Sequence, residues 1–215
     1  MVGVAATQQE SPRACRLVAA SGSGRRKMAA ADPRAVRAGM PRKRDAGTAR
    51  KHGLAPVLGR DARVLILGSF PGEASLAAQQ YYAHPRNHFW PLVGAIVGEA
   101  LAEMRYRTRL AALRRHRIGL WDVIVACERR GSLDGAIRNA EHGEIVRVQH
   151  AAPQLALVCF NGKTAARAEP AWRSAGYATR ILPSSSPAYT RPFDEKLAQW
   201  MALREFVRIG PGSGR

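Results

Sequence analysis

The chain has 215 residues, 46% of them hydrophobic, which is enough for one domain with a buried core and an additional segment. Residues 1–60 hold 13 Lys and Arg against 3 Asp and Glu, a net charge of +10, and residues 61–215 hold 21 against 13, a net charge of +8. Positive charge in both parts favours a polyanionic partner. Nucleic acid is favoured over a membrane surface, because no basic amphipathic helix and no membrane span is evident.

Residues 1–50 are rich in Ala, Gly, Ser, Pro and Arg and show no periodic hydrophobic pattern. This composition predicts a disordered basic tail. An arginine-rich, acid-poor leader is also typical of organelle transit peptides, and that alternative stays open.

The cysteine content indicates the compartment. Cys15, Cys127 and Cys159 form no CxxC pair and leave one thiol unpaired in any disulfide scheme. A reducing compartment is therefore expected. We predict a cytoplasmic protein, associated with the nucleoid of a bacterium.

From residue 57 onward, short apolar segments alternate with helical patterns. Strands covered on both faces are predicted for residues 64–67, 118–125, 155–160 and 179–182. Helices are predicted for residues 89–97, 105–115, 133–140, 144–150, 164–175 and 194–206. The alternation predicts an α/β fold, a three-layer sandwich with a central four-stranded parallel sheet.

Ligands of such sheets bind beyond the carboxyl ends of the strands. Four loops are expected there, at residues 68–87, 127–134, 161–162 and 183–189. The Gly-Ser-Phe-Pro-Gly sequence of residues 68–72 predicts a tight turn with exposed backbone amides. Residues 79–90 contain four aromatic side chains, an Arg, two His and an Asn, which is more than a simple connection requires. This stretch is typical of a pocket wall.

Four sequence blocks resemble the hypoxanthine-DNA (deoxyinosine) glycosylase branch of the uracil-DNA glycosylase superfamily. They are residues 68–72 (GSFPG), 80–90 (QYYAHPRNHFW), 160–162 (FNG) and 183–188 (PSSSPA). Each lies at the carboxyl end of a predicted strand. The resemblance covers residues 57–208 and implies a glycosylase domain there. Its implied activity is the hydrolytic removal of deaminated bases, hypoxanthine and also uracil, from DNA in base excision repair; which base is preferred stays open.

The expected base pocket follows from this resemblance and from side-chain chemistry. A base that leaves the stack is held against aromatic rings and recognised along its edge. Phe70 and Tyr82 are the candidates for stacking. Asn161, which offers both a donor and an acceptor, is the candidate for binding the base edge. Backbone amides of residues 68–72 are suited to stabilise the negative charge on the leaving base.

Ser69 stands where many superfamily members have an Asp or Asn, two residues before the Pro-Gly of the first block. A hydroxyl is a poor general base near neutral pH. The resemblance implies that Asn87 carries the main catalytic role, by orienting the attacking water or holding the base. We predict Asn87 and Ser69 as the catalytic residues of a dissociative reaction that depends mainly on electrostatic stabilisation.

The fourth block supplies the expected DNA contacts. It resembles the wedge loop of the superfamily, in which Ser hydroxyls bind phosphates and the loop tip lies near the vacated stack. The residues concerned are Ser184, Ser185, Ser186 and Pro187. DNA containing deaminated bases is the expected partner of a monomeric protein.

No cofactor is expected. His84 and His88 are four residues apart, but Pro85 interrupts the helix that a metal-binding pair needs. Three cysteines cannot supply the four ligands of an iron–sulfur cluster. Residues 57–208 contain only Lys163 and Lys196 as candidate lyase nucleophiles, so we predict a monofunctional enzyme, with Lys163 near the third block as the exception to test.

Ordinary structural roles compete with several of these assignments. Asn161 is also suited to cap a helix, and capping or a buried hydrogen bond is the expected role of Asp122 and Asp134. Phe89 and Trp90 are expected in the core. Arg129 and Arg130 either contact phosphate or are solvated. A non-catalytic DNA-binding protein on a glycosylase-like fold is the alternative function, whereas an enzyme for free nucleosides conflicts with the positive charge.

Overall fold

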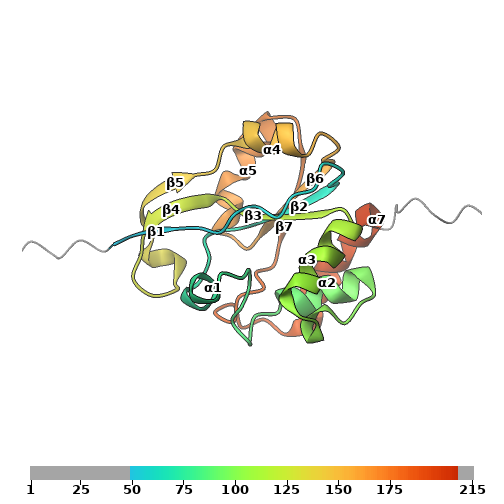
Figure 1. Cartoon of the computed structure of the whole chain (residues 1–215), viewed down its shortest axis with the longest axis horizontal. Helices are drawn as coiled ribbons and strands as arrows, with labels where there is room; N and C mark the ends of the chain where they lie inside the picture. Colours follow the sequence, from blue (N-terminus) through green and yellow to red (C-terminus); the bar gives the residue numbers. More distant parts are fainter. Residues whose placement is uncertain (1–48, 208–215) are drawn as a thin grey trace, which may run out of the picture. The chain divides into compact units, whose positions relative to one another are not determined.

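The computed structural model describes residues 49–207 of the chain (Figure 1). The tail predicted for residues 1–50 lies outside the described residues, apart from Ala49 and Arg50. A parallel sheet with the strand order β3-β2-β6-β7 forms the centre of the described part. Its strands are β2 (Val64–Gly68), β3 (Ile118–Asp122), β6 (Leu157–Asn161) and β7 (Ala178–Leu182). The predicted four-stranded parallel sheet is confirmed.

Helices cover both faces of this sheet (Figure 1), so the predicted three-layer α/β sandwich is confirmed. One layer contains α2 (Phe89–Val97), α3 (Tyr106–Arg115), α6 (Phe193–Trp200) and α7 (Arg204–Val207). The other contains α4 (Ile145–Ala151) and α5 (Glu169–Ser174). Side chains alternate along β2: Val64 and Ile66 pack toward the first layer, Leu65 and Leu67 toward the second.

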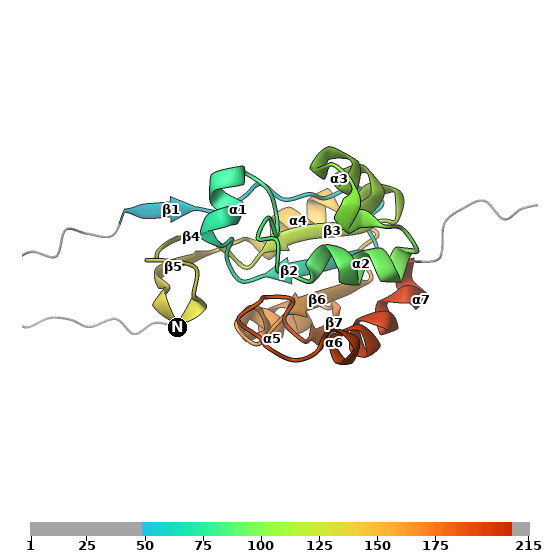
Figure 2. The same ribbon diagram turned by 90° about the horizontal axis from the view of Figure 1, so that it is seen from below.

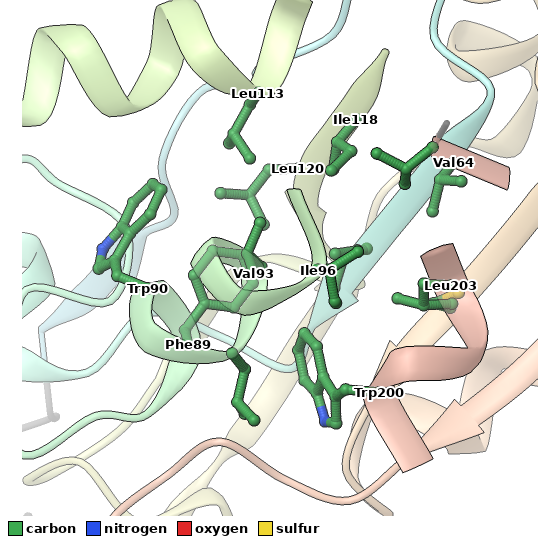
Figure 3. Close-up of a cluster of buried hydrophobic side chains, with 14 of the residues drawn as sticks. Val64, Phe89, Trp90, Val93, Ile96, Leu113, Ile118, Leu120, Trp200 and Leu203 are labelled. Carbon is green, nitrogen blue, oxygen red and sulfur yellow. The ribbon is translucent and has the colours of Figure 1, made fainter. Parts of the chain in front are cut away.

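The core under the first layer fixes the start of α2 (Figure 3). Phe89 and Trp90 are buried there, as expected. The Phe89 ring meets the Trp200 ring of α6 edge-on, with 6.0 Å between centroids. Trp90 Nε1 donates a hydrogen bond to the backbone oxygen of Tyr81 at 3.2 Å. These contacts hold the segment before α2, which carries Asn87, against the parallel sheet.

An additional antiparallel sheet, with the order β1-β4-β5, is absent from the sequence prediction. It consists of β1 (Arg50–His52), β4 (Ile124–Glu128) and β5 (Arg138–His142) and lies beside one end of the parallel sheet (Figure 2). The single strand predicted for residues 118–125 is wrong, because the chain changes sheets at Val123, whose amide donates to Gly68 O at 2.9 Å.

The helix predicted for residues 133–140 is also wrong. This segment holds the short 3-10 helix η2 (Asp134–Ala136) and the beginning of β5. Every residue of β5 is exposed, so no hydrophobic period marks it as a strand. Its pairing with β4 determines its conformation instead.

The other predicted helices are found with small changes of boundary. The helix predicted for residues 89–97 is α2, and α3 and α4 each begin one residue later than predicted. The helix predicted for residues 164–175 is η3 (Ala165–Ala168) followed by α5, and that for residues 194–206 is α6, η4 (Met201–Leu203) and α7. Two short helices, α1 (Glu73–Ala78) and η1 (Leu101–Glu103), are not anticipated. Within residues 49–207, no helix combines the length and hydropathy needed to cross a membrane.

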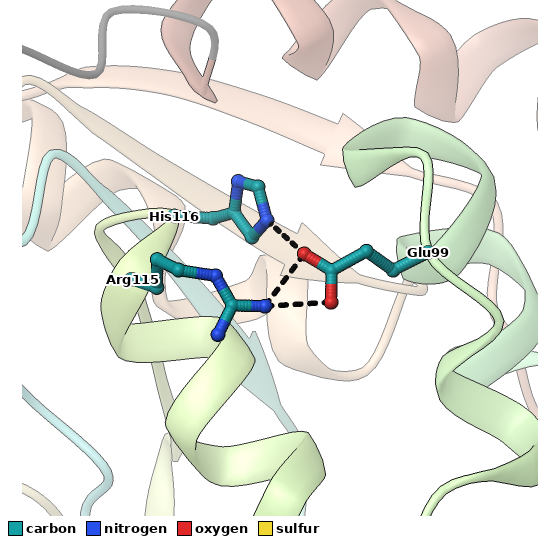
Figure 4. A network of polar contacts seen from close by, with 3 residues as sticks. All are labelled: Glu99, Arg115 and His116. Atoms are coloured by element: carbon teal, nitrogen blue, oxygen red, sulfur yellow. Dashed lines mark hydrogen bonds and ion pairs between the residues drawn. The ribbon is translucent and has the colours of Figure 1, made fainter. Parts of the chain in front are cut away.

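An ion-pair network joins the ends of α2 and α3 (Figure 4). Arg115 Nη2 lies 2.7 and 2.6 Å from the two carboxylate oxygens of Glu99, and His116 Nε2 also contacts Glu99. These hydrogen bonds lower the pKa of Glu99. Since α3 leads directly into β3, the network lies toward the amino ends of the parallel strands, opposite the predicted site.

Candidate active site

A cavity of about 340 Å³ lies at the carboxyl ends of the parallel strands. All four predicted loops contribute to its wall. Eight of the nine predicted site residues line it: Ser69, Phe70, Tyr82, Asn87, Asn161, Ser184, Ser186 and Pro187. The structure therefore brings together nearly the whole set from separate loops of the chain.

Ser185 is the exception. It is fully buried, at 0% exposure, and does not line the cavity. Its amide and hydroxyl both bind the side chain of Asn161. The prediction that Ser185 contacts a DNA phosphate is wrong for this structure, because its polar groups point into the protein.

The first turn is packed closely against its neighbours. Gly68 ends β2, and a Cβ atom there would collide with the Asp122 carboxylate and lie 3.0 Å from the Tyr82 hydroxyl. Only glycine fits this approach. Within residues 49–207, the amides of Phe70 and Gly72 donate no hydrogen bond. These two amides are available to bind a negative charge, as predicted for the turn.

Phe70 lies beneath a buried arginine. The Arg129 guanidinium is 4.8 Å from the centroid of the Phe70 ring and donates to the backbone oxygen of Pro71. Arg129 is only 1% exposed, so it is neither solvated nor placed at the surface to bind phosphate. Burial lowers the pKa of its guanidinium. One side of the Phe70 ring is thus covered by a cation, and the ring also lines the cavity.

Tyr82 is held in place on two sides. Its ring stacks on Phe89, with 3.8 Å between centroids and an interplanar angle of 13°. Its hydroxyl accepts a hydrogen bond from Asn161 Nδ2 at 3.1 Å. Its φ of 53° is in the left-handed region, which is unusual for a tyrosine. Burial raises the pKa of the Tyr82 hydroxyl far above its usual range, so it stays neutral.

The side-chain amide of Asn161 makes three hydrogen bonds within the protein. Nδ2 donates to the Tyr82 hydroxyl at 3.1 Å and to Ser185 Oγ at 2.8 Å. Oδ1 accepts from the Ser185 amide at 2.8 Å. Asn161 is not a helix cap, since η3 begins after Thr164. Direct binding of a base by Asn161 remains a prediction. A base acceptor has to displace one of the two Nδ2 hydrogen bonds, whereas Oδ1 keeps a second lone pair for a base donor.

Asn87 precedes α2 and lines the cavity half-buried. Its Oδ1 accepts a hydrogen bond from the Phe89 amide at 3.0 Å, so it caps the first turn of α2. The backbone amide of Asn87 donates a hydrogen bond to the backbone oxygen of His84 at 2.9 Å. In the described part of the chain, Nδ2 has no hydrogen-bond partner, which leaves a donor for a ligand.

Two carboxyl groups lie in the cavity wall; Asp134 makes a hydrogen bond of the kind expected from the sequence, whereas Asp122 Oδ2 makes none among residues 49–207. Asp122 ends β3, is 4% exposed, and its Oδ2 has no partner among residues 49–207. The pKa of Asp122 is raised to about 8, mainly by burial and also by the nearby charge of Asp134, whereas Arg129 acts to lower it. Asp134 is not a helix cap: it is the first residue of η2, whose N-cap position is Leu133, and no side chain forms a capping bond there. Instead, Asp134 Oδ1 accepts a hydrogen bond from Ser69 Oγ at 2.8 Å.

Neither predicted lysine lines the cavity. Lys163 is exposed, and Lys196 is only 1% exposed and donates to the backbone oxygen of Tyr189 at 2.7 Å. His88 Nδ1 lies 3.5 Å from Lys196 Nζ, and His84 Nδ1 accepts from the Arg86 amide at 3.2 Å. Among residues 49–207, no three His, Cys, Asp or Glu side chains gather as a metal site would require.

Another cavity, of about 500 Å³, is lined mainly by apolar residues that include Trp121, Ile145 and Trp172. Asp122 lines both cavities. None of the predicted site residues lies in the wall of this one. It is therefore not the site that the four sequence blocks form.

Comparison with known proteins identifies similar chains. The model of the uracil DNA glycosylase superfamily matches residues 56–205. A protein of Methanosarcina barkeri named hypoxanthine DNA glycosylase is 44% identical over 151 residues, which is 70% of this chain and 96% of the relative. Its namesake from Methanosarcina acetivorans is 43% identical over 153 residues, 71% of this chain and 97% of the relative.

A solved structure is also similar. It is the solution NMR structure of a protein from Methanosarcina acetivorans, provisionally assigned as a uracil DNA glycosylase. It aligns with a TM-score of 0.69 and 42% identity, covering 74% of this chain and 99% of the other. All three similar proteins come from an archaeal genus, so they do not support the bacterial source expected from the sequence.

Proposed function

Because the chain belongs to the uracil DNA glycosylase superfamily, we propose that it removes hypoxanthine from DNA by hydrolysis of the N-glycosidic bond. The observation that carries this proposal is the cavity at the carboxyl ends of β2, β3 and β6, where the four family blocks meet. The names of the two Methanosarcina relatives support hypoxanthine as the substrate. Uracil is proposed as a second substrate.

The cavity suits a base that has left the helix. Phe70 and Tyr82 offer aromatic surfaces, and a cavity of about 340 Å³ is of the size that proteins use for small ligands. Asn87 Nδ2 is a free donor for a base oxygen or nitrogen. The amides of Phe70 and Gly72, which donate no hydrogen bond in the described part of the chain, support stabilisation of the charge that develops on the leaving base.

We propose a monofunctional reaction. A lyase needs a nucleophilic amine in contact with the sugar. Lys163 is exposed outside the cavity wall, and the Lys196 ammonium is bound to Tyr189 O. These positions favour water as the nucleophile.

The loop around Ser184 and Ser186, whose hydroxyl-bearing side chains are half-buried in the cavity wall, is proposed to bind DNA phosphates. The positive charge of the chain supports a DNA substrate over a free nucleoside. We further propose that the protein acts as a monomer in the cytoplasm. Size-exclusion chromatography with light scattering tests the oligomeric state.

A duplex with one deoxyinosine in a labelled strand tests the function. The protein is expected to leave an abasic site, so the strand breaks only after alkali treatment. A matched deoxyuridine duplex measures the proposed second activity. Binding of both duplexes without cleavage would favour the non-catalytic alternative, and hydrolysis of free inosine alone would favour a nucleosidase.

A further inference from the structure

Hydrolysis moves a proton from the attacking water to an acceptor, and the two predicted catalytic residues are poor acceptors. Asn87 Oδ1 already accepts a hydrogen bond from the Phe89 amide. Its free Nδ2 can only donate. The hydroxyl of Ser69 is a weak base near neutral pH. A proton of the attacking water therefore needs another acceptor.

Two other titratable side chains of the wall are also unsuited to this role. His84 Nδ1 accepts from the Arg86 amide at 3.2 Å, so a neutral His84 ring carries its proton on Nε2 and presents a donor to the cavity. Asp122, with a pKa raised to about 8 by burial, is protonated near neutral pH. The His84 Nδ1 lone pair is thus occupied, and the protonated Asp122 carboxyl is not a base.

Asp134 is the other carboxyl group of the wall, and its geometry fits the role. It lines the cavity half-buried, and Ser69 Oγ holds its Oδ1 at 2.8 Å. The loop that carries it is fixed a second time, because the Glu73 amide donates to Ser132 Oγ at 2.9 Å. In residues 49–207, Asp134 forms no ion pair that would occupy its other oxygen.

On this basis we propose that Asp134 is the catalytic base that binds and deprotonates the attacking water, and that Ser69 is its positioning residue. This inference rests on the proposed glycosylase function. Many superfamily members carry a carboxylate or amide at the position of Ser69; here a carboxylate reaches the same place from 65 residues further along the chain.

The reaction balances with water as the only co-reactant. The water oxygen forms a bond to C1′ of the deoxyribose, and one water proton passes to an Asp134 oxygen. The bond between C1′ and N9 of hypoxanthine breaks, and its electron pair leaves with the base. The base then takes a proton from solvent, and Asp134 returns its proton to solvent. Asn87 Nδ2 and the turn amides bind the base as it becomes negative.

Single-turnover cleavage of a deoxyinosine duplex tests the inference with Asp134→Asn. The amide oxygen still accepts the Ser69 hydrogen bond but cannot take a proton, so we expect the rate to fall on the order of 10²-fold or more. The control is Asp61→Asn, which removes the same charge from an exposed residue whose carboxylate lies 3.7 Å from Arg117. The control is expected to cleave at the parental rate.

Chemical rescue separates catalysis from structure. Asp134→Ala removes the carboxylate, and added formate is expected to raise its rate by about tenfold or more, by replacing the missing base. Thermal melting and affinity for an abasic-site duplex check that each variant folds and binds DNA. A parental rate in Asp134→Asn overturns the inference, as does a loss in Asp134→Ala that formate leaves unchanged. If the parental protein itself fails to cleave deoxyinosine DNA, the proposed function is overturned together with the inference.

Discussion

Asn161 and Ser185 are joined by two hydrogen bonds: the Ser185 amide donates to Asn161 Oδ1, and Asn161 Nδ2 donates to Ser185 Oγ, each at 2.8 Å. The end of β6 is thereby tied to the loop that follows β7. Because Nδ2 also binds the Tyr82 hydroxyl, one side chain organises two parts of the cavity wall.

Asn161→Ala is expected to lower the free energy of unfolding by about 1–3 kcal/mol, since it leaves the buried Ser185 amide without a partner. Asn161→Asp keeps an acceptor for the Ser185 amide but replaces the Nδ2 donor by a carboxylate oxygen. The ratio of deoxyinosine to deoxyuridine cleavage is therefore expected to change more than the free energy of unfolding does. Urea denaturation and paired cleavage assays measure the two effects. An unaltered ratio in Asn161→Asp would leave Asn161 with a structural role alone.

Asn87→Ala is expected to lower the single-turnover rate on the order of 10²-fold or more, because a preorganised donor is lost. It also removes the cap on the Phe89 amide, at about 1 kcal/mol of stability. Ser69→Ala, which leaves the Asp134 carboxylate in the cavity, is expected to lose much less activity. If Asn87→Ala melts early yet cleaves at the parental rate, its role is capping only.

The carboxyl of Asp122 predicts a pH dependence of stability. Its pKa is raised from an ordinary 3.8 to about 8, so the folded protein binds this proton more tightly than the unfolded chain does. The contribution of this group to the free energy of unfolding therefore falls as pH rises through that interval. In Asp122→Asn this decrease, of the order of a few kcal/mol, is expected to disappear. Melting curves at about pH 5 and about pH 9 measure it; equal pH slopes in parent and variant would contradict the prediction.

Arg129→Met is expected to affect the substrate site more than stability. The guanidinium is buried, and its Nε and Nη1 have no partner among residues 49–207, so an apolar chain of similar length is expected to offset most of the loss of the hydrogen bond to Pro71 O. Loss of the cation above Phe70 is expected to lower deoxyinosine cleavage by up to about tenfold. The control is Arg130→Met, which removes an exposed arginine. This variant is expected to change the affinity for deoxyinosine DNA and for undamaged DNA equally. A large drop in melting temperature for Arg129→Met alone would show that its role is structural.

Deletion of residues 1–39, which contain seven Lys and Arg against two Asp and Glu, is expected to weaken DNA binding and flatten its salt dependence. Single-turnover cleavage at saturating protein is expected to change little. Affinity titrations at several salt concentrations test this. Loss of turnover in a folded truncated protein would place the tail in the active site.

The parts of the fold that the sequence predicts are those with strong local patterns. The apolar run of β2 and the aromatic start of α2 are each buried on the faces that their residues indicate. By contrast, β5 is exposed along its whole length and depends on pairing with β4. No local pattern predicts it.

The same distinction holds in the site. Ser69, Phe70 and Asn87 lie in blocks that are recognisable from the sequence, and the cavity contains them. The contact between Ser69 and Asp134 joins residues 65 positions apart. It depends on where the chain turns after β4, which only the tertiary structure determines. The burial of Ser185 likewise depends on its hydrogen bonds with Asn161, 24 residues earlier in the chain, and not on the local sequence of its loop.

The ammonium of Lys196, buried beneath the backbone of Tyr189, has a consequence for DNA recognition. Its hydrogen bond to Tyr189 O fixes the loop after β7 before any DNA is bound. The conformational entropy of this loop is therefore lost when the protein folds and not when it binds DNA. The loop backbone is then expected to superimpose closely in free and DNA-bound protein. The conformational work of recognition falls on the nucleic acid, which has to kink and release a nucleotide toward a surface that is already formed.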